Sequence, residues 1–368
     1  MDIEKMINSG LKNIPKYPFG KPKSAVSAEL FKGQIVKINS NENTIGVSPK
    51  AIEAAEKILS NLNLYPESTN LELRRKVAQK FQIQPENVFI GNGAGEIIYY
   101  AAIAFLNNGD EVIVPEVTYP LYLIAFKMMR ANVVKSAMNG YKIDTGKIQE
   151  LITEKTKIIA LCNPNNPTGD IINKDEMFRF IEKIPDDVLL IIDEAYIDFA
   201  DNNDLLDTVS EIKNGRRNLY VIRTLSKAYG LAGLRIGYGI GDTSINDEMQ
   251  KIKLPFNISL ITQHAAEAAL KDDDFLNKTV ATIKKERNFL YEKLNKMNLN
   301  YMKSSTNFIL IDVKRDSSDT TLELEKRGVM VRDAAPYGIK NCIRVTIGKR
   351  DQNERFLQAL CEVLGIKS

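Results

Sequence analysis

Histidine is almost absent from this sequence, and tryptophan is absent altogether. The 368 residues include one histidine, His264, and no tryptophan. Hydrolytic triads and most catalytic zinc sites use histidine. With one histidine in the chain, sites built on several histidines are excluded. His264 lies in an alanine-rich stretch that is typical of a helix, and we interpret it as a structural residue. No metal site is expected.

Cysteine and long apolar runs are also scarce. The three cysteines, Cys162, Cys342 and Cys361, are odd in number and widely spaced, so they predict neither a disulfide framework nor a metal quartet. The N-terminus carries acidic residues where a signal peptide would be basic and then apolar, and no apolar run is long enough for a membrane span. We therefore expect a cytoplasmic protein with no membrane partner.

The charges nearly cancel. The chain has 50 basic and 47 acidic residues, which gives a net charge of +3, and both signs are spread along its length. A protein that binds nucleic acid usually gathers its basic residues into a patch, so no nucleic-acid partner is expected. Any specificity for anions must come from individual arginine and lysine side chains.

Between residues 85 and 240, short apolar runs alternate with amphipathic segments. This pattern is typical of βα units and predicts an α/β fold with a mostly parallel sheet flanked by helices. After residue 245, a long charged helix followed by strands and helices indicates a second, smaller α/β domain. We predict an N-terminal arm over residues 1–30, a large domain over residues 31–250 and a small C-terminal domain over residues 251–368. Strands are expected at Val88–Gly91, Glu111–Pro115, Lys157–Cys162, Val188–Asp193, Leu219–Thr224, Arg235–Gly239, Phe308–Val313 and Ile343–Ile347, and helices at Glu96–Leu106, Lys174–Ile184 and Asp274–Met297.

Chemically useful side chains follow three of these strands directly. Asp193-Glu-Ala-Tyr196 ends one strand, Asn163-Pro-Asn-Asn-Pro-Thr-Gly169 follows a second, and Thr224-Leu-Ser-Lys227 follows a third. In an open parallel sheet, ligands bind outside the carboxyl ends of the strands. An acid, an amide, a phenol and a lysine are therefore expected at one edge of the sheet.

This set of side chains matches the needs of pyridoxal 5′-phosphate (PLP) chemistry. The cofactor needs a lysine that holds it as a Schiff base, an anion that keeps its ring nitrogen protonated, and donors to its phenolate oxygen. Lys227, Asp193 and the pair Asn166 and Tyr196 fit these three roles. We predict Lys227, Asp193 and Tyr196 as catalytic residues.

The cofactor phosphate needs several donors, and the sequence offers two groups of them. Thr224 and Ser226 precede the lysine, and Arg235 follows it by eight residues. The turn Gly91-Asn-Gly-Ala-Gly-Glu96 joins a strand to a helix, where backbone N–H groups and the helix dipole favour an anion. Such a turn alone is a weak signal. Together with the lysine it predicts phosphate contacts at Gly93, Ala94 and Gly95.

With these motifs, the chain resembles fold-type I aminotransferases and, among them, the histidinol-phosphate aminotransferase family. The resemblance implies a large domain with a seven-stranded sheet, a smaller C-terminal domain and PLP as the cofactor. It covers nearly the whole chain, because the matching segments run in order from residue 41 to residue 348. They are Asn41-Glu-Asn43, Tyr65-Pro66, Gly91-Asn-Gly-Ala, Thr118-Tyr119, Asn165-Asn-Pro-Thr-Gly169, Asp193-Glu-Ala-Tyr196, Ser226-Lys-Ala-Tyr-Gly-Leu-Ala-Gly-Leu-Arg235 and Arg344-Val-Thr-Ile-Gly348.

The resemblance also implies roles that spacing alone does not give. Tyr119 would stack on the pyridine ring of the cofactor, and Tyr65 would reach the cofactor phosphate of a partner subunit, which implies a homodimer with shared active sites. Arg344 would hold the anionic end of the substrate, with Arg332, Tyr17 and Asn166 as further substrate contacts. A guanidinium group suits a carboxylate or a phosphate, because its fork binds two oxygens at once.

Two positions depart from the family pattern. Gly95 stands where the family usually has aspartate, and Thr44 stands where proline is usual. Glycine keeps the backbone N–H donor and loses only the side chain, so phosphate binding is expected to survive. Neither departure touches Lys227.

The resemblance implies transamination between histidinol phosphate and 2-oxoglutarate or glutamate, a step of histidine biosynthesis. An aromatic amino-acid aminotransferase and a PLP-dependent decarboxylase of phosphoamino acids use the same cofactor residues and stay open. A PLP-binding regulator would need an effector module, and no basic helix-turn-helix is evident. A dinucleotide-dependent oxidoreductase would leave the Asp193 and Lys227 arrangement unexplained.

Overall fold

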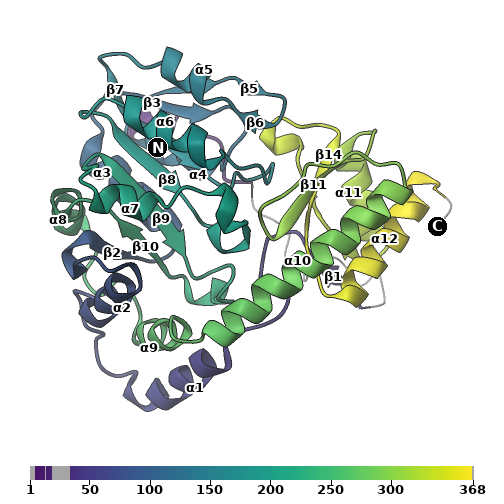
Figure 1. The fold of residues 1–368 in the computed structure, drawn as a ribbon, viewed down its shortest axis with the longest axis horizontal. Helices are drawn as coiled ribbons and strands as arrows, with labels where there is room; N and C mark the ends of the chain where they lie inside the picture. The colour runs from purple at the N-terminus through teal and green to yellow at the C-terminus, as the bar shows by residue number, and fades with distance from the viewer. Residues whose placement is uncertain (1–4, 13, 19–33, 367–368) are drawn as a thin grey trace.

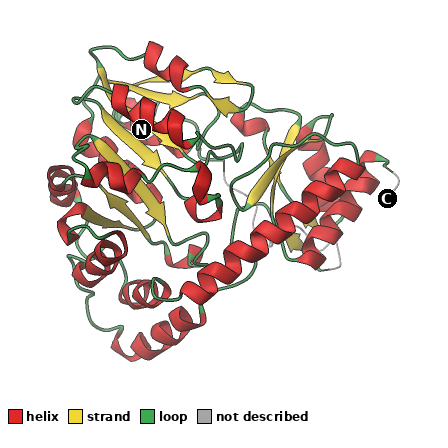
Figure 2. Ribbon diagram, in the orientation of Figure 1, coloured by secondary structure: helices red, strands yellow, loops and turns green. Residues whose placement is uncertain are grey.

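A seven-stranded sheet forms the centre of the structure (Figures 1 and 2). The computed structural model describes residues 5–12, 14–18 and 34–366. Most of the expected arm, residues 19–30 in particular, lies outside the described residues. The strands are, in order across the sheet, β2 (Val88–Gly91), β10 (Gly237–Ile240), β9 (Leu219–Thr224), β8 (Leu189–Asp193), β7 (Thr156–Cys162), β3 (Glu111–Pro115) and β4 (Asn132–Ser136).

The sheet is parallel apart from one strand. β10 runs antiparallel to both of its neighbours, β2 and β9. The connection from β9 to β10 contains only the short turn η8 (Ala232–Leu234) and no crossover helix. Parallel neighbours need a longer crossover, so the chain returns beside β9 in the opposite direction. The expected α/β fold with a mostly parallel sheet is confirmed.

Helices cover both faces of the sheet because its strands are apolar on both sides. Ile158, Ala160 and Cys162 of β7 pack on one face, while Ile159 and Leu161 pack on the other. On the first face lie α3 (Ala94–Phe105), α4 (Leu121–Met128) and α8 (Thr243–Ile252). On the second face lie α5 (Thr145–Glu150), α6 (Lys174–Lys183) and α7 (Thr208–Lys213).

Local sequence explains where these helices begin. Asn173 accepts a hydrogen bond from the backbone N–H of Glu176 and caps α6, and Met177, Phe180 and Ile181 then bury one face of that helix. Side chains at these spacings share one face of an α-helix. The small hairpin of β5 (Met138–Asn139) and β6 (Lys142–Ile143) precedes α5.

A second, three-stranded sheet lies beside the long helix α10 (Figure 1). The sheet contains β11 (Phe308–Asp312), β14 (Cys342–Thr346) and β13 (Arg332–Asp333), in antiparallel order. Around it lie α10 (Asp273–Lys296), α11 (Ser317–Lys326) and α12 (Arg350–Leu364). The smaller α/β unit expected near the C-terminus is therefore present.

Contacts also cross the expected domain boundary near residue 250. β1 (Val36–Lys37) pairs with β12 (Val329–Met330), and α9 (Leu260–Ala269) packs against α1 (Pro49–Ile58) and α2 (Leu71–Phe81). The division at residue 250 thus stays a prediction.

The remaining short turns are η2 (Ser9–Leu11), η4 (Leu59–Asn61), η5 (Pro85–Asn87), η6 (Ile197–Phe199), η7 (Asn202–Asp204) and η9 (Ala335–Tyr337). No helix in the described part of the chain is long and apolar enough to cross a membrane.

Candidate active site

A cavity of about 320 Å³ opens at the carboxyl ends of β7, β8 and β9. The start of α3 contributes to its wall, and so do the segment after β1 and the sheet of β13 and β14. Nearly all of the site residues expected from the sequence meet here. Those that line it are Tyr17, Ala94, Gly95, Tyr119, Asn166, Asp193, Tyr196, Thr224, Ser226, Lys227, Arg235, Arg332 and Arg344.

Asp193 lies at the floor of the cavity with both carboxylate oxygens engaged. Its side chain is 2% exposed. The Tyr122 hydroxyl group donates to Oδ2 at 2.9 Å, and the backbone N–H of Ala195 donates to Oδ1 at 3.0 Å. Burial raises the pKa of Asp193 to about 6, because water no longer stabilises the charged form. A cation in this cavity would favour the charged carboxylate.

Lys227 projects into the same cavity from the end of β9. Burial lowers the pKa of its amino group to about 8, and the positive charges of Arg344 and Arg235 lower it further. Asp193 and Glu42 act in the opposite direction. The amine therefore loses its proton far more easily than an ordinary lysine, which makes it a usable nucleophile and base near neutral pH.

The hydroxyl group of Tyr196 is held by two amides. Asn41 Nδ2 donates to it at 3.0 Å, and Asn166 Nδ2 lies at 3.5 Å. Asn166 Oδ1 in turn accepts from Nη1 of Arg344 at 2.6 Å. The Tyr196 ring lies beside the lysine, with Nζ of Lys227 5.6 Å from the ring centroid. Asn166 and Tyr196, expected as partners, are thus neighbours.

An anion cradle lies between Arg235 and the first turn of α3. Gly93 has φ +81°, a backbone conformation that favours glycine, and a Cβ added there would lie 2.5 Å from Nη2 of Arg235, so a side chain at this position would displace the guanidinium group. Arg235 donates to the carbonyl oxygen of Ala232 at 2.9 Å and lies 3.4 Å from Ser226 Oγ. Ser226 also contacts the Thr224 hydroxyl group at 2.9 Å. The expected phosphate contacts therefore converge.

Arg332 and Arg344 form the opposite wall and are 8% and 5% exposed. Nη2 of Arg344 donates to the carbonyl oxygen of Asn39 at 3.1 Å, and its Nη1 reaches the Tyr337 hydroxyl group at 3.3 Å. Arg332 donates to the carbonyl oxygen of Pro18. Nε of both arginines is buried without a hydrogen-bond partner, and neither pairs with a carboxylate of the described residues. Among the residues that the structure describes, these two buried cations therefore lack an anionic partner.

Three tyrosines line the cavity near these arginines. The ring of Tyr17 packs edge-on against Tyr119, with centroids 6.2 Å apart. Burial raises the pKa of Tyr337, but the charges of Arg344 and Arg332 outweigh burial, so its pKa lies below the ordinary value. Tyr17 and Tyr119, expected as a substrate contact and a stacking ring, both line the cavity, and these roles stay predictions.

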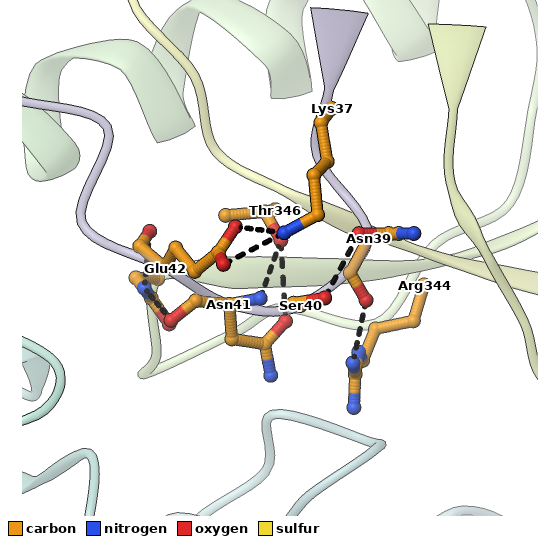
Figure 3. Close-up of polar contacts among 8 residues, drawn as sticks. Lys37, Asn39, Ser40, Asn41, Glu42, Arg344 and Thr346 are labelled. Atoms are coloured by element: carbon orange, nitrogen blue, oxygen red, sulfur yellow. Dashed lines mark hydrogen bonds and ion pairs between the residues drawn. The ribbon is translucent and has the colours of Figure 1, made fainter. Parts of the chain in front are cut away.

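The segment that follows β1 forms part of the cavity wall (Figure 3). Lys37 and Glu42 form an ion pair through both carboxylate oxygens, at 2.7 and 2.6 Å. Between them, the Asn41 backbone N–H donates to Thr346 Oγ1 at 2.9 Å, and the Asn39 carbonyl oxygen accepts from Arg344. This segment is therefore fixed on β14 at both Arg344 and Thr346.

Two of the expected site residues do not line this cavity: Gly93, which borders Arg235, and Tyr65. Tyr65 is 81% exposed, and its ring stacks on Phe256 at 4.6 Å between centroids.

Of the two departures from the family pattern, Thr44 donates to the carbonyl oxygen of Ile347 at 3.1 Å. A Cβ at Gly95 would lie 3.0 Å from Cδ2 of Leu121, so a side chain there would require the Leu121 side chain to shift.

Sequence reasoning gave no site role to four residues that shape the site. They are Asn41, Glu42, Tyr122 and Tyr337. Tyr122 comes three residues after Tyr119, but only Tyr122 lies on α4, and the nearly uniform apolar sequence of that helix gives no periodic signal that singles it out. Tyr337 follows Ala334-Ala-Pro in a stretch with no periodic pattern. No local signal in the sequence brings it near Arg344.

A family model matches most of this chain. Residues 33–360 match the model of aminotransferase class I and II. A protein of Carboxydothermus hydrogenoformans named histidinol-phosphate aminotransferase 2 is 38% identical over 98% of this chain and 100% of its own length. The histidinol-phosphate aminotransferase of Moorella thermoacetica is 36% identical over 96% of this chain and 91% of its own length.

Solved structures show the same fold. The histidinol-phosphate aminotransferase of Sinorhizobium meliloti, solved in complex with pyridoxal-5′-phosphate, superimposes with a TM-score of 0.88 at 25% identity over 98% of this chain and 97% of that one. The histidinol-phosphate aminotransferase of Clostridium acetobutylicum gives a TM-score of 0.83 at 28% identity over 90% of this chain and 99% of that one.

Proposed function

This chain belongs to the aminotransferase class I and II family, and we propose that it uses PLP to move an amino group between histidinol phosphate and 2-oxoglutarate. The observation that carries the substrate assignment is the pair of buried guanidinium groups, Arg332 and Arg344, whose Nε atoms have no partner in the described part of the chain. Buried charges need an ionic partner, so a substrate anion is required here.

The residues at the strand ends fit PLP. Gly93 leaves room against Arg235 that a Cβ would fill, and together with Ser226 this cradle suits a phosphate group. Lys227 supplies the amine that would hold the cofactor. Asp193 lies in a buried position where only a cation would keep it charged at low cost, and a protonated pyridine nitrogen is such a cation.

When bound, PLP supplies an electron sink for the bonds at the substrate carbon. Lys227 would move the proton, because an amine with a pKa of about 8 can both release and accept one near neutral pH. Asp193, held by Tyr122, would place its negative charge beside the ring nitrogen and so keep that nitrogen protonated. Asn166 and Tyr196 would orient the cofactor oxygen, and Tyr119 would cover the ring.

The substrate end of the cavity favours a dianion. A phosphate carries more charge than a carboxylate, and two guanidinium groups match it better than one. Tyr17 lies at the same wall, where its hydroxyl group would add a contact. The α-carboxylate of glutamate would need chiefly Arg344.

A panel of amino donors with 2-oxoglutarate as the acceptor tests the substrate. Histidinol phosphate should be the preferred donor, and glutamate should form in equal amount. A preference for phenylalanine or tyrosine would move the chain to the aromatic aminotransferases. Release of carbon dioxide without a need for a keto acid would show a decarboxylase. The cofactor is tested by the visible absorbance of the purified protein and by borohydride, which should trap it on Lys227.

We also propose a homodimer in which Tyr65 reaches the partner's cofactor phosphate. Tyr65 and Phe256 form an exposed aromatic pair, and Leu62 and Leu254 nearby are 54% and 64% exposed. An apolar groove between α1 and η8 is lined by Val47, Ala51, Ile52, Ala55, Leu59, Leu231 and Leu234, among others. Monomeric proteins rarely expose so much clustered apolar surface, which supports contact with a second copy.

A further inference from the structure

Asn41 contacts Tyr196 through a fully buried hydrogen bond. Nδ2 of Asn41 lies 3.0 Å from the Tyr196 hydroxyl oxygen, and the two side chains are 1% and 4% exposed. The sequence alone assigns Asn41 no role beyond membership of a motif. Its position beside a residue proposed to bind the cofactor raises the question of what the amide does there.

The amide of Asn41 is held in one orientation by Thr346. The backbone N–H of Asn41 donates to Thr346 Oγ1 at 2.9 Å, and the Thr346 hydroxyl group donates to Asn41 Oδ1 at 3.3 Å (Figure 3). The left-handed backbone of Asn41, with φ +54°, allows both bonds to form with one residue. With Oδ1 directed at Thr346, Nδ2 is left to face Tyr196.

The Tyr196 hydroxyl group accepts hydrogen bonds from the described residues but donates none to them. A phenol has one proton to donate and accepts through its oxygen. The oxygen accepts from Asn41, and Asn166 Nδ2 lies within 3.5 Å of it. Among the described residues, the Tyr196 proton has no acceptor. The proton is therefore available to a ligand in the cavity.

We propose that Asn41 is a positioning residue that makes the Tyr196 hydroxyl group a hydrogen-bond donor to the phenolate oxygen of bound PLP. Accepting from Asn41 strengthens the same hydroxyl group as a donor, because linked hydrogen bonds polarise one another. The inference rests on the proposed PLP binding. It also links β14 to the cofactor, since Thr346, which orients the amide, lies two residues from Arg344.

The test measures how the visible absorbance of the bound cofactor titrates with pH. A donor to the phenolate oxygen stabilises its negative charge and so lowers the pKa of this titration. Asn41→Gly removes the amide and tolerates the left-handed backbone, and it should raise the pKa by about half a unit to one unit. Asn41→Asp replaces the donor with an acceptor for the Tyr196 proton, and it should raise the pKa by about one to two units.

Each variant has a matched control. Asn70 also has a left-handed backbone, with φ +55°, and is 2% exposed, but it does not line the cavity. Asn70→Gly and Asn70→Asp should leave the pKa unchanged. In a Tyr196→Phe background, Asn41→Gly should have no further effect, because the hydroxyl group through which it acts is gone. The part of the Asn41→Asp shift that survives there measures the added charge alone.

The possible results separate the two proposals. A visible absorbance band with a raised pKa in Asn41→Gly, lost in the Tyr196→Phe background, supports the inference. An unchanged pKa in Asn41→Gly, or an equal shift with phenylalanine at position 196, overturns the inference and leaves PLP binding intact. A wild-type protein that takes up no PLP overturns the proposed function and the inference with it.

Discussion

Arg332 of β13 and Arg344 of β14 lie directly opposite each other in an antiparallel strand pair, so two buried guanidinium groups face one cavity. Like charges at opposed positions destabilise a sheet. Neither arginine forms an ion pair with a carboxylate in the described part of the chain. A ligand that brings a dianion between them would offset this repulsion, whereas a singly charged ligand would offset less of it.

Replacing Arg332 should therefore affect the phosphate substrate selectively. Arg332→Gln is expected to lower kcat/KM for histidinol phosphate by roughly one to two orders of magnitude, since a charge-assisted hydrogen bond contributes about 1.5–3 kcal/mol. Glutamate should lose less, because its carboxylate would need chiefly Arg344. Steady-state kinetics with both donors measure the difference. Arg327→Gln is the control, because Arg327 pairs with Glu323 and Glu362 outside the cavity. Equal losses for the two donors would contradict a phosphate site.

Asp193 should make the cofactor-free protein less stable as pH rises. Its folded pKa, about 6, lies above the ordinary value of 3.8, so the folded state holds a proton that the unfolded state has lost between these two values. Stability from this group is full below about pH 4 and is lost by about pH 6, by up to about 3 kcal/mol. An asparagine side chain cannot titrate, so Asp193→Asn should gain in melting temperature relative to the wild type over this window. If the melting temperatures of the two proteins changed in parallel with pH, the pKa of Asp193 would not be raised.

The same variant separates stability from catalysis. Asp193→Asn should still bind PLP through the phosphate cradle and Lys227, but its turnover should fall steeply, because an amide does not keep the ring nitrogen protonated as an anion does. Absorbance measures the bound cofactor and a donor assay measures turnover. Near-normal turnover would mean that another carboxylate serves the ring nitrogen.

Lys227 should capture PLP faster as the pH rises to about 8, and no faster beyond it. Burial lowers the pKa of the amine from 10.5 to about 8, with help from Arg344 and Arg235, and only the neutral amine forms the covalent bond. Stopped-flow absorbance on the cofactor-free protein measures the rate. Arg344→Gln should move the midpoint upward, because one positive charge is removed. If the rate keeps rising to about pH 10, the pKa of Lys227 is that of an ordinary lysine. The variant Lys227→Ala should show no capture of PLP and no turnover.

Tyr65 should act across a subunit interface. Tyr65→Phe and Lys227→Ala subunits, each poorly active alone, should regain activity when they are mixed and refolded, because one of the two hybrid sites has both wild-type residues. Phe178→Ala is the control, since Phe178 is another exposed aromatic residue, on α6 and away from the patch around Tyr65. Normal PLP affinity and activity in Tyr65→Phe would remove the cross-subunit role.

The strands that carry the site could be predicted because they are buried on both faces. β2, β3 and β9 have the bounds that their apolar runs predict. The edge strand β4, with Asn132 and Lys135 exposed, gives too weak an apolar signal. α4 is apolar nearly all round and therefore lacks an amphipathic pattern, which hid Tyr122.

Contacts between distant segments could not be predicted. Asn41 and Thr346 are separated by 305 positions, and Asn166 and Arg344 by 178. No periodicity within a segment shows which remote side chain it will meet. The strand ends of a parallel sheet form an edge by geometry alone, so Asp193, Asn166 and Lys227 could be placed together. The wall formed by β13, β14 and the segment after β1 depends on how separate sheets pack.

Because β1 pairs with β12, this part of the fold cannot form until most of the chain has been synthesised on the ribosome. Val36 emerges early, yet its partner Val329 is made nearly 300 positions later. Lys227, Asp193 and Gly93 lie at or just after the ends of β9, β8 and β2, and all three strands are synthesised before then. Arg344, which lines the cavity, and Thr346, which holds Asn41, are among the last residues to leave the exit tunnel. A nascent chain therefore holds Lys227 and Asp193 before it has the arginine wall that we propose binds the substrate anion, and the complete cavity can form only when nearly all of the chain has been made.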